Sequence, residues 1–148
     1  MESSATPARV LVVANQTAAT PALVEAVRER AQAGPAHFTL LVPATAHGFH
    51  RVVDPEDQDR TEVEGTIAKA VPLLEEAAGG PVESMVGVPE PLAAIQDAIN
   101  LKGFDEIIIS MLPKRLSRWL RLDLPHKVAG LGLPVTTVTA RSREGVTA

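Results

Sequence analysis

The chain has 148 residues, of which 45% are hydrophobic, 22% are charged and only 3% are aromatic. This length favours one domain, and the composition is typical of a globular protein whose core is built from Val, Ile, Leu and Ala. The net charge of −4 argues against a nucleic-acid partner, and the absence of cysteine excludes disulfide and thiolate chemistry. Neither a basic-then-apolar leader nor an apolar run long enough to span a membrane is visible, so we expect a cytoplasmic protein.

The first third of the chain predicts a tail, a strand, a helix and a second strand. Residues 1–8 are small and polar, which is typical of a loose tail. Residues 9–14 form an apolar run that favours a buried strand. Thr20 then offers an N-cap, followed by a first-turn Pro, for a helix that ends at Gly34. Residues 37–43 predict the second strand.

A long connection follows the second strand. It covers residues 44–59 and contains five charged residues, and connections of this length often carry function or move. Residues 63–78 then repeat apolar side chains at helical spacing. Pro72 lies inside this segment and should kink the helix or restart it, because proline lacks the N–H that the helix needs.

The remaining chain predicts three further strands separated by helices. Residues 82–87 form the third strand, and a helix that starts within residues 89–91 ends at Gly103. Residues 107–110 read Ile-Ile-Ile-Ser, which is typical of a strand buried on both faces. A β-rich run preceded by Gly and Pro predicts the last strand within residues 132–139, and a loop and a helix connect it to the fourth strand.

Strands and helices therefore alternate along the whole chain, which predicts an α/β fold. We expect a five-stranded parallel doubly wound sheet in the order 3-2-1-4-5, with helices on both faces. The predicted domain covers residues 9–140, and residues 141–148 form a C-terminal tail. Ligands of such sheets bind where the strand order reverses, at the carboxyl ends of the strands. Here that point lies between the first and fourth strands, whose ends carry Asn15 and Ser110.

The order and spacing of several segments resemble the universal stress protein family over nearly the whole chain. These segments are Ala14-Asn15-Gln16-Thr17, Leu41-Val42-Pro43, Gly87-Val88-Pro89-Glu90-Pro91, Phe104-Asp105-Glu106-Ile107-Ile108-Ile109-Ser110 and Gly132-Leu133-Pro134-Val135-Thr136-Thr137-Val138. The resemblance implies a Rossmann-like fold, a role in the stress response and a homodimer.

ATP-binding members of that family carry a glycine motif after the fourth strand. The matching positions of this chain hold Ser110, Pro113, Asp123 and Leu124, so all four depart from the motif. Proline has no N–H to offer a phosphate, and a carboxylate repels one. The family's usual strand-one Asp is replaced by Asn15. The resemblance therefore implies the fold with a degraded triphosphate site.

If a ligand binds, we expect it in a crevice at the carboxyl edge of the sheet. The expected lining residues are Val13, Asn15, Val42, Ser110 and Met111. Lys114 or Arg115 would then reach an anionic group of the ligand, since both belong to a basic run over residues 114–121. The alternative is that these bases are solvated while Trp119 packs inward.

Other motifs allow simpler interpretations. Residues 15–20 carry hydroxyls spaced as in a flavodoxin phosphate loop, but Thr20 also serves as an ordinary N-cap. His47 and His50 lack further ligands, so no metal site is predicted. Asp123 is expected to cap the last helix with its carboxylate. We identify no catalytic residue.

We therefore expect a non-enzymatic regulatory or binding module rather than an enzyme, with no required cofactor. One alternative is a nucleotide-binding protein, for ATP or another adenine nucleotide, that uses the basic run 114–121; an enzymatic version of it would hydrolyse ATP weakly. Another is a structural dimer that presents a basic helix to a protein partner. Residues 134–139 form an edge strand without a guarding charge, which favours a homodimer, unless residues 140–148 shield that edge.

Overall fold

The computed structural model describes residues 7–14, 17–44, 55–111, 119 and 123–139, and for residues 55–62 it describes the backbone alone. One five-stranded sheet has the predicted order β3-β2-β1-β4-β5, and every neighbouring pair is parallel. The strands are β1 (Ala8–Val13), β2 (Ala36–Pro43), β3 (Val82–Gly87), β4 (Glu106–Met111) and β5 (Val135–Thr139). The helices are α1 (Pro21–Ala33), α2 (Pro55–Ala78), α3 (Pro91–Lys102) and α5 (Leu124–Ala129).

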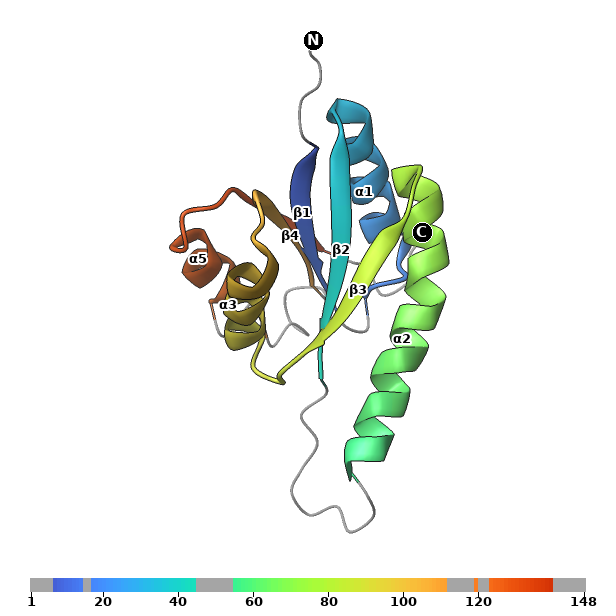
Figure 1. Ribbon diagram of the computed structural model, residues 1–148, viewed down its shortest axis with the longest axis vertical. Helices are drawn as coiled ribbons and strands as arrows, with labels where there is room; N and C mark the ends of the chain where they lie inside the picture. Colours follow the sequence, from blue (N-terminus) through green and yellow to red (C-terminus); the bar gives the residue numbers. More distant parts are fainter. Residues whose placement is uncertain (1–6, 15–16, 45–54, 112–118, 120–122, 140–148) are drawn as a thin grey trace, which may run out of the picture.

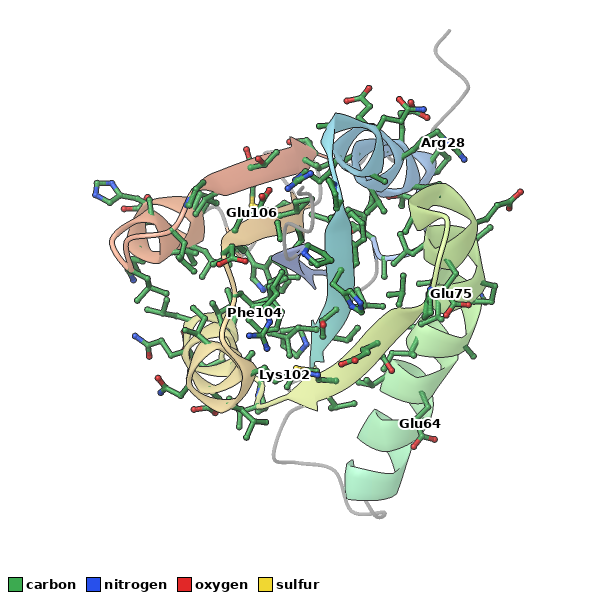
Figure 2. All side chains as sticks on the ribbon, turned by 45° about the horizontal axis from the view of Figure 1, so that its top comes forward. Arg28, Glu64, Glu75, Lys102, Phe104 and Glu106 are labelled. Atoms are coloured by element: carbon green, nitrogen blue, oxygen red, sulfur yellow. The ribbon has the colours of Figure 1, made fainter. Side chains whose placement is uncertain are left out.

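The sheet separates two layers of helices. Helices α1 and α2 cover one face, and α3 and α5 cover the other, as both views show (Figures 1 and 2). Side chains of β1 alternate between the two: Val10 and Val12 pack in the α1/α2 layer, while Leu11 and Val13 pack in the α3/α5 layer. These four side chains are buried, which confirms the prediction of a central strand with both faces covered.

Helix α2 departs from the sequence expectation in two ways. It begins at Pro55, so the last residues of the connection predicted over residues 44–59 belong to the helix instead. It also continues through Pro72 to Ala78, so of the two effects predicted for this proline, a kink or a restart, the restart is wrong. Ala70 and Leu74, on either side of Pro72, are both buried in the α1/α2 layer. Their packing against the sheet compensates for the N–H that proline lacks.

Polar contacts hold the amino-terminal edge of the sheet to its surroundings. Arg30, in the last turn of α1, donates from Nε and Nη2 to both carboxylate oxygens of Glu106 at 2.9 and 2.8 Å. Glu106 opens β4 and is labelled in Figure 2. The hydrogen bonds to this carboxylate raise the pKa of the Arg30 guanidinium. Asp105 accepts a hydrogen bond from the backbone N–H of Arg9 at 2.8 Å, which joins β1 to the turn before β4.

At the carboxyl edge of the sheet, helix α3 packs very closely against the end of β3. A Cβ placed on Gly87 would lie 2.6 Å from the Cβ of Ala94 in α3 and 3.1 Å from Cδ1 of Leu41 in β2. Glycine is therefore needed there so that α3 can approach the sheet. The carboxylate of Glu90 caps α3 by accepting from the N–H of Ala93 at 2.7 Å. Among the described helices, none is long and apolar enough to cross a membrane.

Candidate functional site

The strand order reverses between β1 and β4. Strand β1 pairs with β2 on one side and with β4 on the other, and Val13 lies level with Leu41 and with Ile109. The chain leaves β1 toward α1 on one face and returns from α3 on the other face to form β4. Loops that diverge in this way leave room between the strand ends, so this is the place where the fold can hold a ligand.

The structure brings four of the predicted site residues to this edge, but it buries all of them. Val13 and Met111 pack in the α3/α5 layer, whereas Val42 packs in the α1/α2 layer. Ser110 precedes Met111 on β4 and therefore points to the α1/α2 side. Exposed fractions between 0% and 6% make these side chains part of the core. A ligand at this edge would meet the backbone at the strand ends. Asn15, Lys114 and Arg115 lie outside the described residues.

Two hydroxyls meet at the reversal point. Ser110 Oγ donates to Thr17 Oγ1 at 2.6 Å, and Thr17 Oγ1 donates in turn to the carbonyl oxygen of Ser110 at 3.3 Å. Their exposed fractions are 0% and 1%. The sequence did not predict this pair, because the partners are 93 positions apart. The spacing of hydroxyls after β1 drew attention to Thr17 but gave no hint of its partner.

The resemblance to a flavodoxin phosphate loop is not supported at Thr20. Thr20 occupies the N-cap position of α1, as predicted, but its side chain makes no capping hydrogen bond. Its hydroxyl instead donates to the carbonyl oxygen of Thr17 at 2.8 Å. The hydroxyls of Thr17, Thr20 and Ser110 thus all donate to protein atoms. In this arrangement none of them donates to a phosphate.

Asp123 occupies the N-cap position of α5, but the prediction that its carboxylate caps the helix is wrong. Its backbone is left-handed, with φ 59° and ψ 36°, and its side chain makes no capping hydrogen bond. Side-chain capping needs an extended backbone at that residue, so the left-handed turn directs the carboxylate away from the helix N–H groups. Its Oδ2 instead lies 3.8 Å from His126 Nδ1 at the surface. Glycine adopts this conformation most readily, and the family's motif has glycine at the matching position.

Trp119 is a packing residue. Its exposed fraction is 8%, and it lies in the α3/α5 layer with Met111 and Leu124. This confirms the interpretation in which Trp119 packs inward. The bases of the run 114–121 lie outside the described residues, so their role in anion binding stays a prediction.

Two further features bear on ligand chemistry. An open hollow of about 420 Å³ lies along the outer side of α1, lined by Pro21, Ala22, Glu25, Ala26 and Glu29. Its two carboxylates would repel an anion. In the described part of the chain, no three His, Cys, Asp or Glu side chains are grouped so that they could hold a metal ion.

Comparison with known proteins finds similarity in three-dimensional structure only. No family model matches the chain, and no curated protein matches it significantly. A universal stress protein from Archaeoglobus fulgidus is 18% identical with a TM-score of 0.63, covering 88% of this chain and 93% of that one. The universal stress protein from Archaeoglobus fulgidus in complex with dAMP is 18% identical with a TM-score of 0.61, covering 90% of this chain and 98% of that one. A universal stress protein in complex with cAMP is 16% identical with a TM-score of 0.59, covering 90% of this chain and 98% of that one.

Proposed function

We propose that this chain, which has the universal stress protein fold, is a divergent member of that family and acts as a ligand-binding regulatory module rather than as an enzyme. The observation that carries the proposal is the chemistry of the β1/β4 reversal point. Thr17, Thr20 and Ser110 place their hydroxyls there, and each donates inward. Because all three hydrogens are engaged by protein atoms, none of these three hydroxyls is free to act as a nucleophile, which favours a binding role over a catalytic one.

The proposed ligand contains an adenine-type base and does not depend on a triphosphate. Two structures that share the fold hold dAMP and cAMP, which supports an adenine ligand in this fold. Asp123 disfavours the binding of a triphosphate, because its carboxylate replaces a glycine of the ATP motif. At 4 Å and an effective dielectric of 20, two like charges repel by roughly 4 kcal/mol before screening. The side chain of Asp123 is 67% exposed, so water and salt reduce this figure severalfold.

Calorimetry with Mg-ATP, AMP and adenosine tests this proposal, together with native mass spectrometry of freshly purified protein. We expect a co-purified or added adenine compound to bind, and Mg-ATP to bind weakly or not at all. The variant Asp123→Gly should bind Mg-ATP more tightly than the wild type. Micromolar affinity of the wild type for Mg-ATP would contradict the degraded triphosphate site, and hydrolysis of ATP at a useful rate would favour the enzymatic alternative.

We also propose a homodimer that pairs β5 with its copy. Strand β5 ends the sheet and has a neighbour only at β4 among the described strands. Val135 packs in the α3/α5 layer and Val138 in the α1/α2 layer, while Thr136, Thr137 and Thr139 are exposed. A β-branched edge strand of this kind favours pairing with an identical strand across a two-fold axis.

The direction of the backbone groups selects the variant that tests the dimer. The carbonyl of Pro134 accepts from the N–H of Ile107 and therefore faces β4. Because backbone groups alternate sides along a strand, Thr136 and Val138 also face β4, whereas Thr137 faces the free edge. Thr137→Pro should therefore yield monomers in sedimentation at tens of micromolar, and Thr137→Val should remain dimeric. A monomeric wild type, or a dimer that tolerates Thr137→Pro, would exclude this interface.

A further inference from the structure

Strand β3 is the outermost strand of the sheet on the side opposite β5, and β2 is its neighbour among the described strands. The carbonyl of Gly87 accepts a hydrogen bond at 2.8 Å from the N–H of Ala44, which follows β2, so the backbone of Gly87 faces β2. Backbone groups alternate sides along a strand. The N–H and carbonyl groups of Ser84 and Val86 therefore face the outer edge of β3, away from β2.

Helix α2 covers the beginning of this outer edge but not its end. The N–H of Val82 donates to Glu75 Oε2 in α2 at 3.0 Å, and the side chain of Val82 is buried in the α1/α2 layer. Val86 lies four residues further along the same face of the strand, yet it is 54% exposed, because β3 diverges from α2 toward its carboxyl end (Figure 1). Val88, just beyond the strand, is 44% exposed. The second half of β3 thus combines outward-facing backbone groups with exposed apolar side chains.

Carboxylates flank the exposed part of the edge at both ends. Glu75 lies at its beginning, on the side of α2 that faces β3 (Figure 2). Glu90 follows its end and is exposed. Glu83 is exposed as well, but its charge is offset by an ion pair with Lys102. A second copy placed antiparallel on β3 would bring acidic ends of both chains together, and like charges repel. The charges therefore favour a positively charged occupant over a second copy of this chain.

We propose that the outer edge of β3 binds an extended, positively charged segment of another protein, which adds a strand to the sheet. The backbone of the segment pairs with Ser84 and Val86, and an apolar side chain of the segment covers Val86. Basic side chains on either side of that apolar residue lie near Glu75 and Glu90, so charge sets the choice of partner. The inference is independent of the adenine ligand and of the dimer, because β3 belongs neither to the β1/β4 reversal point nor to the β5 edge.

NMR titration with the peptide Lys-Val-Lys-Val-Lys tests the proposal, and Glu-Val-Glu-Val-Glu is the matched control peptide. We expect the lysine peptide to bind roughly tenfold more tightly at low salt, because exposed ion pairs replace charge repulsion. Failure of the lysine peptide to bind at about 1 mM, or equal binding of the two peptides, would overturn the proposal.

A substitution at Val86 tests whether the backbone of β3 makes the contact. Val86→Pro removes an outward N–H without removing a hydrogen bond to β2, so it should weaken binding of the lysine peptide roughly fivefold. Val86→Thr keeps the N–H and the β-branched shape, and it should bind as the wild type does. If Val86→Pro does not fold, Val86→Lys replaces it, since a positive charge at this exposed position should also weaken binding. Wild-type affinity in the folded Val86→Pro protein, or in Val86→Lys where that variant replaces it, would overturn the proposal.

Hydrogen exchange and sedimentation distinguish the other possible occupants of this edge. In the isolated wild type, the amides of Ser84 and Val86 should exchange roughly tenfold faster than the amide of Met85, which faces β2, and the lysine peptide should remove this difference. Protection of Ser84 and Val86 in the isolated protein would show that this chain covers its own edge. Assembly of the wild type that Val86→Pro reverses would assign the edge to a second copy. Either result would overturn the proposal, whereas failure of adenine compounds to bind would leave it intact.

Discussion

Replacing Gly87 by alanine tests how closely α3 approaches the carboxyl edge of the sheet. The added Cβ would lie 2.6 Å from the Cβ of Ala94, and two carbons in contact normally lie about 3.5–4.0 Å apart. Either β3 or α3 must therefore move by about 1 Å. Overpacking of this size costs roughly 1–3 kcal/mol, and the smaller backbone entropy of alanine in the unfolded chain returns about 0.5–1 kcal/mol. We expect Gly87→Ala to lower the free energy of unfolding by roughly 1–2 kcal/mol.

Two further substitutions make this prediction specific. Ala94→Gly should lose about 2 kcal/mol alone, because it removes a buried methyl group and places glycine in a helix. Combined with Gly87→Ala, it should lose at least 1 kcal/mol less than the sum of the two, because one Cβ replaces the other. Gly65→Ala is the control: Gly65 lies in α2 with no atom within 4 Å of an added Cβ, so the change should stabilise by about 0.5–1 kcal/mol.

Urea unfolding measures the wild type and the four variants, and the buried Trp119 gives a fluorescence signal for the native state because it is the only tryptophan. If Gly87→Ala is as stable as the wild type, or if the two changes add within 0.5 kcal/mol, α3 does not pack at this distance and the explanation for Gly87 is incorrect.

The remaining predictions concern surface charges and the left-handed turn. Arg30→Lys should lower the free energy of unfolding by about 0.5–1 kcal/mol at low salt, because a single ammonium cannot make both hydrogen bonds to the β4 glutamate. The control Arg28→Lys should be as stable as the wild type, and equal losses in the two variants would contradict this explanation. The hydrogen bond from Lys102 lowers the pKa of Glu83 below its ordinary value of 4.5. Its contribution to stability is therefore present above about pH 4.5 and is lost as the pH falls through the lowered pKa, so the unfolding free energy of Glu83→Gln should fall less between pH 7 and pH 3 than that of the wild type. If the unfolding free energies of Glu83→Gln and the wild type fall equally with pH, the Lys102 contact does not stabilise the ionised glutamate. Asp123→Gly should stay within about 0.5 kcal/mol of the wild type, and Asp123→Ala should lose about 1 kcal/mol, because an alanine Cβ is strained in a left-handed turn. Calorimetric unfolding decides, and an alanine variant more stable than the glycine variant would show that the turn is not strained.

The sequence was sufficient to predict the architecture because each strand is a local signal. The apolar run at Ile107 to Ser110 and the Gly and Pro before β5 identify strands without knowledge of their neighbours. Their alternation with helices indicates a parallel doubly wound sheet, and the expected order 3-2-1-4-5 is the one observed. The start of α2 at Pro55 was missed because the acidic residues after it form no apolar stripe, although Pro is a common first residue of a helix.

The candidate site was less predictable because its features depend on distant residues or on backbone geometry. The hydrogen bond between Thr17 and Ser110 joins positions that only the folded sheet brings together. The left-handed conformation of Asp123 is a backbone state, and the residue type alone suggested an ordinary cap. The close contact of Gly87 with Ala94 likewise becomes visible only when α3 is placed on the sheet.

The division of the core by the sheet has a consequence for how this protein can change. Val13 and Met111 belong to one layer, while Thr17 and Ser110 lie on the side of the other, and the backbone of β1 and β4 stands between them. Substitutions on opposite sides share no side-chain contact and should therefore act independently on stability. A lineage of such proteins could remodel the apolar packing of the α3/α5 layer without disturbing the hydroxyl pair, or lose the pair and keep that packing. The two halves of the core would then be free to change separately.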